Sequence, residues 1–135
     1  MSDLSLPDLY LKTEVSIEEA ARLVPARDSC LVLSGVVHVI TAWNPGDLRP
    51  THEENQKASG ELRMRLLGLG LKPIRALGAD PDSDHAEESW AVSGLSDDQA
   101  RALGAEFGQV AVFRLADGVQ TVLACKENWQ RTRSL

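Results

Sequence analysis

Five polar side chains stand where the local sequence predicts strand ends or inward-facing positions. Asn44 follows a long apolar run, and Asn55 lies three residues before Ala58 on the inward face of a predicted helix, so the two amides are expected to meet. The other three are Glu87, Ser89 and Gln109. Amide, carboxylate and hydroxyl groups together predict hydrogen bonding to a small polar ligand. The alternative is structural: Asn44 forms a turn, Asn55 caps a strand end and Gln109 is a satisfied buried amide.

Glu87 is the candidate catalytic residue. It shares a predicted strand face with Ser89, roughly 7 Å away by the rise of a strand, and this geometry permits acid–base chemistry or ligand hydrogen bonds. A solvent-facing strand surface explains the pair equally well. Thr51 begins the predicted helix that carries Asn55, and the free amides there are candidates for binding a carboxylate or phosphate, unless Thr51 only caps the helix.

The sequence predicts no metal site and no cofactor. His38, His52 and His85 are isolated in a strand, a helix start and a loop; His38 is expected to be hydrogen-bonded and the other two solvated. The acidic loop of Asp80, Asp82 and Asp84 lacks the glycine and closing glutamate of a calcium loop. Glycine-rich phosphate loops and the common hydrolase motifs are missing from the chain.

Composition narrows the class of partner. The 135 residues carry a net charge of −6, which makes nucleic acid an unlikely partner, and the longest apolar stretch is too short to cross a membrane. The N-terminus lacks the basic segment of a secretory signal, so a soluble protein of the cytoplasm is expected. Cys30 and Cys125 are predicted to be buried free thiols. The polar tail 126–135 is interpreted as solvated; the alternative is a docking segment for an acidic partner.

The elements that must position these residues begin with a Ser-x-x-Glu pattern at Ser16, which predicts a helix over 17–24. Residues 31–33 and 36–42 follow as a central strand with a bulge at Gly35. A second capping pattern at Thr51 predicts a helix over 52–69.

The second half predicts strands over 72–77 and 87–93, separated by the polar loop 78–86. Ser96 caps a helix that continues through Phe107, and Asp117-Gly118 joins strands 109–115 and 119–125 in a hairpin. The order is α-β-α-β-β-α-β-β in a single domain over 1–135. We therefore predict an α+β fold with a mixed, mostly antiparallel sheet and three helices, two of them on one face.

Short motifs in this order resemble a known family. They are Val39-Ile40-Thr41-Ala42-Trp43-Asn44-Pro45, Glu54-Asn55, Gly78 with Asp80-Pro81, Glu87-x-Ser89, and Phe107-Gly108-Gln109-x-Ala111. The chain from about Val36 to Phe113 resembles the family catalogued as domain of unknown function 3293, with a family-like core over about 36–125. The resemblance implies a bacterial origin and a polar signature at Asn44, Asn55, Glu87, Ser89 and Gln109, and it supplies no activity. Two departures are a short N-terminal region and Glu88 in place of a proline.

Three functions stay open. The leading hypothesis is a small-ligand-binding or regulatory domain with a pocket bounded by the five signature residues. The second is an enzyme that uses Glu87 as general acid or base on an anionic substrate bound near Thr51. The third is a protein-interaction module or homodimer that works through Trp43, Trp129 or an exposed strand edge.

Overall fold

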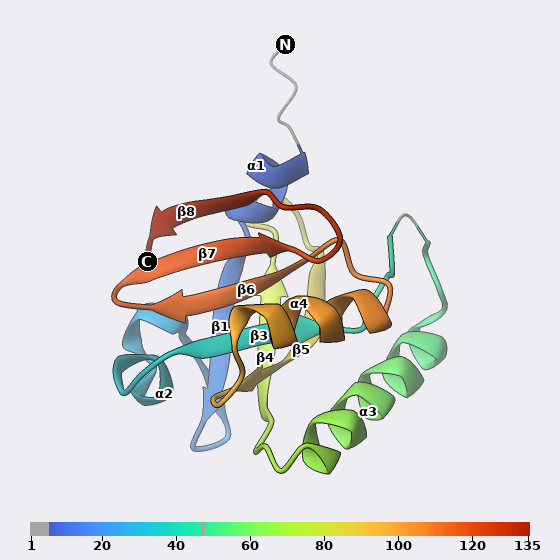
Figure 1. Cartoon of the computed structure of the whole chain (residues 1–135), viewed down its shortest axis with the longest axis horizontal. Coiled ribbons are helices and arrows are strands. Elements are labelled where there is room, and N and C mark those ends of the chain that lie inside the picture. Colours follow the sequence, from blue (N-terminus) through green and yellow to red (C-terminus); the bar gives the residue numbers. More distant parts are fainter. Residues whose placement is uncertain (1–5, 47) are drawn as a thin grey trace.

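Eight β-strands form one curled sheet, and the two longer helices pack on the same face of it (Figure 1). The structure is a computed structural model that describes residues 6–46 and 48–135; the N-terminal residues 1–5, part of the segment on which the signal-peptide expectation rests, lie outside the described part. The helices are α1 (Leu6–Leu11), α2 (Cys30–Leu33), α3 (His52–Gly68) and α4 (Asp97–Glu106), with a 3-10 turn η1 (Ala26–Asp28). The strands are β1 (Glu14–Glu19), β2 (Arg22–Pro25), β3 (Val37–Thr41), β4 (Ile74–Ala79), β5 (Ala86–Val92), β6 (Ala111–Ala116), β7 (Val119–Ala124) and β8 (Gln130–Ser134).

The strand order is β2-β1-β4-β5-β3-β6-β7-β8, and every neighbouring pair is antiparallel. The predicted α+β class and antiparallel sheet are therefore confirmed. β3 is the central strand that the sequence predicted: Val37 through Ile40 are buried because the sheet is covered on both faces. One core lies under α3 and α4 and contains Ile40, Leu62 and Leu103, and the other lies under η1 and α2.

Local signals placed α3 and α4 correctly. Thr51 and Ser96 each form a complete capping box, in which the hydroxyl accepts an amide N–H and the side chain of Glu54 or Gln99 accepts the N–H of the cap residue. The Asp117-Gly118 turn also forms as predicted, with both residues at positive φ, the backbone conformation of a tight hairpin.

The predicted helix over 17–24 is wrong, since this segment is the hairpin of β1 and β2. Val15 and Ile17 alternate with exposed or half-buried neighbours and enter the core, and β1 pairs along β4. Ala20 and Ala21 make the turn at φ values of 49° and 64°. Burial of alternating residues against a distant strand outweighs the local capping pattern.

Residues 31–33 do not belong to the central strand. Ser29 accepts the amide N–H of Val32, and this cap starts the short helix α2; β3 begins only at Val37, so Gly35 is not a bulge within it. The structure therefore has four helices over its described residues, where the sequence predicted three.

The C-terminal segment is not a solvated tail. Gln130–Ser134 pairs with β7 as an edge strand, and Arg133 donates to the carbonyl oxygens of Leu11 (Nε, 2.7 Å) and Thr13 (Nη2, 2.9 Å) at the end of α1. Gln120 donates to the same Thr13 oxygen at 2.9 Å. These bonds satisfy carbonyl groups that a helix end leaves free.

The two cysteines are free, but only one of them is shielded. Cys30 is exposed, contrary to the prediction, while Cys125 is partly buried against the core under α4. None of the helices over residues 6–46 and 48–135 has the length and apolar character needed to cross a membrane.

Candidate functional site

Asn44 and Asn55 meet, as the sequence predicted. The Asn55 Oδ1 accepts the backbone N–H of Asn44 at 3.0 Å, and the Asn55 Nδ2 donates to Asn44 Oδ1, also at 3.0 Å. Asn55 is buried on α3, whereas Asn44 lies just after β3 with φ at 46°, in the left-handed region that asparagine tolerates better than most residues. The reciprocal pair fixes the loop after β3 against the first turn of α3.

Glu87 joins this pair from the start of β5. Asn44 Nδ2 donates to Glu87 Oε2 at 2.9 Å, and His85 Nε2 lies 3.1 Å from the same oxygen. The Glu87 side chain remains 23% exposed, and Oε1 makes no hydrogen bond with any described residue. Two neighbours thus orient the carboxylate through one oxygen and leave the other open to solvent.

Gln109 reaches the network through the backbone. Its Nε2 donates to the carbonyl oxygen of Trp43 at 3.0 Å and more weakly to that of Phe107 at 3.4 Å, and the residue is 6% exposed. Gly108 lets the chain pass close to Pro45, because an added Cβ would lie 2.8 Å from the Pro45 Cβ. Gln109 holds the loop after β3. These bonds agree with the structural alternative, in which Gln109 is a buried amide with its hydrogen bonds satisfied.

Ser89 and Thr51 lie nearby but bond locally. Ser89 is 4% exposed, so the solvent-facing explanation is wrong for it, and its hydroxyl donates to the Glu87 carbonyl oxygen at 3.3 Å. Thr51 is exposed and its hydroxyl is used by the capping box of α3. The network therefore joins four of the six predicted residues, Asn44, Asn55, Glu87 and Gln109, and Ser89 and Thr51 are neighbours of it.

Sequence reasoning missed two ring contacts at this network, one between His85 and Glu87 and one between Trp43 and His52. His85 was expected to be solvated, and it is 51% exposed but also contacts Glu87; its position two residues before Glu87 on one strand face is the signal that predicts this contact. Trp43 and His52 pack edge to face, with ring centroids 5.5 Å apart. The Trp43 indole Nε1 is buried and has no hydrogen-bond partner among the described residues.

A second polar link ties α3 to β5 beside this network. The Trp90 indole donates to both the carbonyl and hydroxyl oxygens of Ser59 at 3.0 Å, and the Ser59 hydroxyl donates to Glu88 Oε1 at 3.1 Å. Ser59 lies one helical turn after Asn55, on the same buried face of α3. The position of α3 on the sheet, and hence of Asn55, is set by both links.

His38 is hydrogen-bonded, as predicted, but it lies away from this network. Its Nε2 is 2.8 Å from Asp97 Oδ1, and Arg114 donates to the other oxygen of Asp97. Burial alone would raise the pKa of Asp97, yet the hydrogen bond from His38 and the charge of Arg114 outweigh it and lower the pKa below the ordinary value of 3.8. These three residues attach the start of α4 to the centre of the sheet.

The carboxylates of the acidic loop between β4 and β5 have partners within the loop and on Lys12. Asp80 accepts the backbone N–H of Asp82 at 2.9 Å, which is the main reason that its pKa is lowered, and Lys12 Nζ lies 2.9 Å from Asp82 Oδ2. Over the described part of the chain, no three His, Cys, Asp or Glu side chains are placed to hold a metal ion together.

Three of the cavities in the described part of the chain, of about 370, 490 and 470 Å³, are lined by none of the six predicted residues. The strand-end network is a partly open polar surface around the Glu87 carboxylate, whose side chain is 23% exposed. Such a surface can hold a small molecule by hydrogen bonds and charge.

The comparisons with known proteins place the chain at the level of family. No curated protein and no solved structure matches it. All five residues of the polar signature lie within the segment that matches a family model, and these are Asn44, Asn55, Glu87, Ser89 and Gln109. The model is described as "Protein of unknown function (DUF3293)" and matches residues 40–112, more than half of the chain, so the chain belongs to this family.

Proposed function

We propose that this protein binds a small polar ligand at the strand-end network, with Glu87 as the main recognition group. The proposal rests on the contacts of its carboxylate. Asn44 and His85 both contact Oε2, Oε1 has no partner among the described residues, and the side chain is partly exposed. A pre-oriented carboxylate loses little entropy when a ligand arrives.

The chemistry of the site favours a ligand that donates hydrogen bonds. An ionised carboxylate accepts hydrogen bonds only, so an amine, guanidine or hydroxyl group is the natural partner of Oε1. Trp43, whose carbonyl oxygen accepts from Gln109, packs edge to face against His52 and gives the loop after β3 an aromatic surface. We propose a small organic cation or a polyol as the ligand class. The protein would have a regulatory role if ligand binding rearranges the loop after β3.

A thermal-shift screen against small metabolites tests this proposal. A ligand present at 100 times its dissociation constant stabilises the folded state by about 2.7 kcal/mol, which is readily measured. The expected hit shifts the wild-type protein, and Glu87→Gln abolishes the shift because it removes the charge while keeping the shape. Glu61→Gln is the matched control, since Glu61 is an exposed carboxylate on α3.

Two outcomes would count against the site. A ligand whose shift survives in Glu87→Gln binds elsewhere, and a broad library without any hit removes the support for ligand binding. In the second case the interaction hypothesis gains weight, through the outer strands β2 and β8.

An enzyme is the second candidate, and the contact between His85 and Glu87 favours it. A carboxylate that accepts from one imidazole nitrogen leaves the other nitrogen free to take a proton, and His85 is half exposed. In that case His85→Gln would retain ligand binding and abolish turnover of the bound compound, whereas a pure binding protein would not convert the compound at all.

We also propose that the protein works in the bacterial cytoplasm. The family resemblance supports the bacterial origin. The exposed free thiol of Cys30 suits a reducing compartment.

A further inference from the structure

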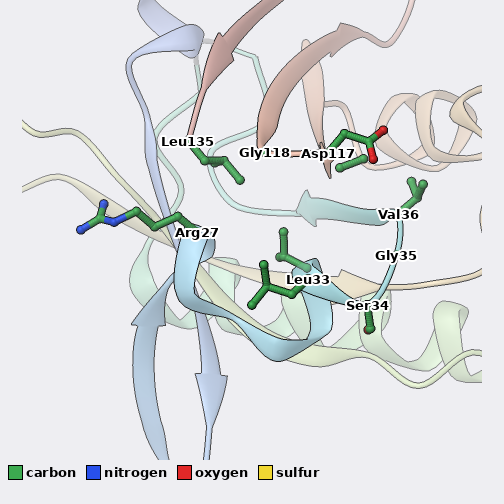
Figure 2. A pocket seen from close by; sticks show the side chains of 10 residues that line it. Arg27, Leu33, Ser34, Gly35, Val36, Asp117, Gly118 and Leu135 are labelled. Atoms are coloured by element: carbon green, nitrogen blue, oxygen red, sulfur yellow. The ribbon is translucent and has the colours of Figure 1, made fainter.

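Two adjacent cavities lie on the face of the sheet opposite α3 and α4, away from the strand-end network. The first, of about 370 Å³, has apolar side chains from α2 and from Val36, just before β3, with Leu33 74% and Val36 48% exposed. The second, of about 490 Å³, lies beside the end of α1. Both are lined by Arg27 and Leu135, so they meet at these two residues. Figure 2 shows Leu33 and Leu135 on opposite sides of the first cavity, with Arg27 extending away at its rim.

The second cavity carries positive charge in an acidic protein. Arg27 makes no hydrogen bond or ion pair with any described residue, and Arg133 donates only to carbonyl oxygens, so its charge has no carboxylate partner in the described chain. Lys12 also lines this cavity but is paired with Asp82. Glu14 is the one acidic side chain of this lining, so Arg27 and Arg133 leave one positive charge in excess, whereas Asp117 lines the first cavity. The molecule as a whole has a net charge of −6, so this local excess is unusual for its surface.

Gln120 adds an unsatisfied group to the same cavity. The residue is fully buried, its Nε2 donates to Thr13, and its Oε1 has no hydrogen-bond partner among the described residues. A buried polar atom without a partner is costly, so this oxygen favours a ligand or water that brings an O–H or N–H group. A hydrogen-bond acceptor beside arginines that have no carboxylate partner in the described chain thus favours an anion that also carries a hydrogen-bond donor.

We infer that these two cavities form one binding site for a small amphiphilic carboxylate, with its charged head at Arg27 and its hydrocarbon tail along Leu33 and Val36. A hydroxyl group close to the carboxylate would supply the donor for Gln120. Apolar contact gives the tail its affinity and the charge fixes the direction of binding. This site is separate from the strand-end network and does not depend on the function proposed there.

Titration followed by residue-resolved NMR tests the inference with three probes kept below their micelle concentrations: decanoate, 3-hydroxydecanoate and decyltrimethylammonium. Decanoate is expected to shift the amide signals of Arg27, Leu33 and Val36, 3-hydroxydecanoate to bind several-fold more tightly, and the cationic probe not to bind. Arg27→Gln should weaken decanoate at least tenfold. Arg22→Gln is the matched control, since Arg22 is an exposed arginine on the neighbouring strand β2 and lines neither cavity.

Three results would overturn this site. They are unchanged affinity in Arg27→Gln, equal binding of the cationic probe, and signal shifts that appear only once micelles or lipid vesicles are present, which would indicate a surface effect. Glu87→Gln is expected to bind decanoate like the wild type, so failure here and failure at the strand-end network are told apart.

Discussion

At the scale of single residues, the strand-end network depends on Asn55. The Asn55 side chain accepts the backbone N–H of Asn44 and donates to the side-chain Oδ1 of Asn44, and no other described group replaces either bond. Asn55→Ala is expected to reduce the free energy of unfolding by about 1–3 kcal/mol, because it leaves polar groups of a partly buried loop unpaired. Urea denaturation measures this change.

The exposed neighbour Gln56 is the control for that measurement. Gln56→Ala lies on the same helical turn but faces solvent, and it should change the stability by less than about 0.5 kcal/mol. Equal effects of the two substitutions would mean that the network contributes nothing to stability.

The two thiols should differ strongly in reactivity. Burial raises the pKa of Cys125 to about 11, so very little thiolate is present near neutral pH, whereas Cys30 is exposed. A thiol reagent at about pH 8 is expected to label Cys125→Ser rapidly, through Cys30, and Cys30→Ser only slowly. Rapid labelling of Cys30→Ser would show that the core under α4 opens readily.

Asp97 should make stability sensitive to acid. Its pKa is lower in the folded state than the ordinary 3.8, so its stabilising contribution is complete above that value and is lost as the pH falls through the folded pKa. From about pH 5 downward the wild type is expected to lose stability more steeply than Asp97→Asn.

Asp98→Asn is the comparison for this pH series, since Asp98 is in the same first turn of α4 and is 94% exposed. Its stability curve should run parallel to that of the wild type. A parallel curve for Asp97→Asn as well would contradict the role given to the His38 and Arg114 contacts.

The sequence predicted part of the site because some of its geometry is local. Asn44 ends a strand and Asn55 faces inward on the next helix, so their meeting follows from two elements joined by a short loop. The contact of His85 with Glu87 was also within reach of strand periodicity. The sequence could not predict the charge of the second cavity beside α1, because Arg27, Gln120 and Arg133 come together only through the tertiary fold.

At the scale of elements, α4 packs on the sheet at a position where only glycine fits. A Cβ on Gly104 would lie 2.5 Å from Cys125 Sγ and 2.6 Å from Val112 Cγ1. Alanine in a helix is worth about 0.5–1 kcal/mol over glycine, but overpacking a core costs about 1–3 kcal/mol, so the clash dominates. Gly104→Ala is expected to lower the melting temperature.

Gly60 provides the opposite case in α3. Nothing lies within 4 Å of a Cβ added there, so Gly60→Ala should stabilise the protein by about 0.5–1 kcal/mol through helix propensity alone. If both alanine variants change stability in the same direction, the close approach of α4 to Val112 and Cys125 is contradicted.

Elements with complete local signals were predicted correctly, and the errors have a common cause. The capping patterns at Thr51 and Ser96 are followed by residues that face inward at helical spacing, so local and tertiary preferences agree. At Ser16 the local capping pattern favours a helix but the tertiary contacts favour a strand, and the segment forms β1 because it pairs with β4. β8 is exposed along most of its length, so it has no apolar alternation from which a strand can be predicted.

At the scale of the whole molecule, the sheet joins segments that are far apart in sequence. β3 pairs with β5 and β6, and β1 pairs with β4, so these three ladders join strands that long stretches of chain separate. The meander of β6, β7 and β8 is local by comparison. A topology of this kind is expected to fold slowly for its size.

Arg133 and Leu11 are 122 positions apart, yet a 2.7 Å hydrogen bond joins them. A ribosome releases Leu11 early and makes Arg133 much later, so the carbonyl groups at the end of α1 lack these donors through most of synthesis. A nascent chain that stops before Gln130 therefore leaves the Leu11 carbonyl oxygen without its arginine donor and presents the bare edge of β7 to any chaperone nearby. Completion of the fold is thereby tied to the moment at which the last strand emerges.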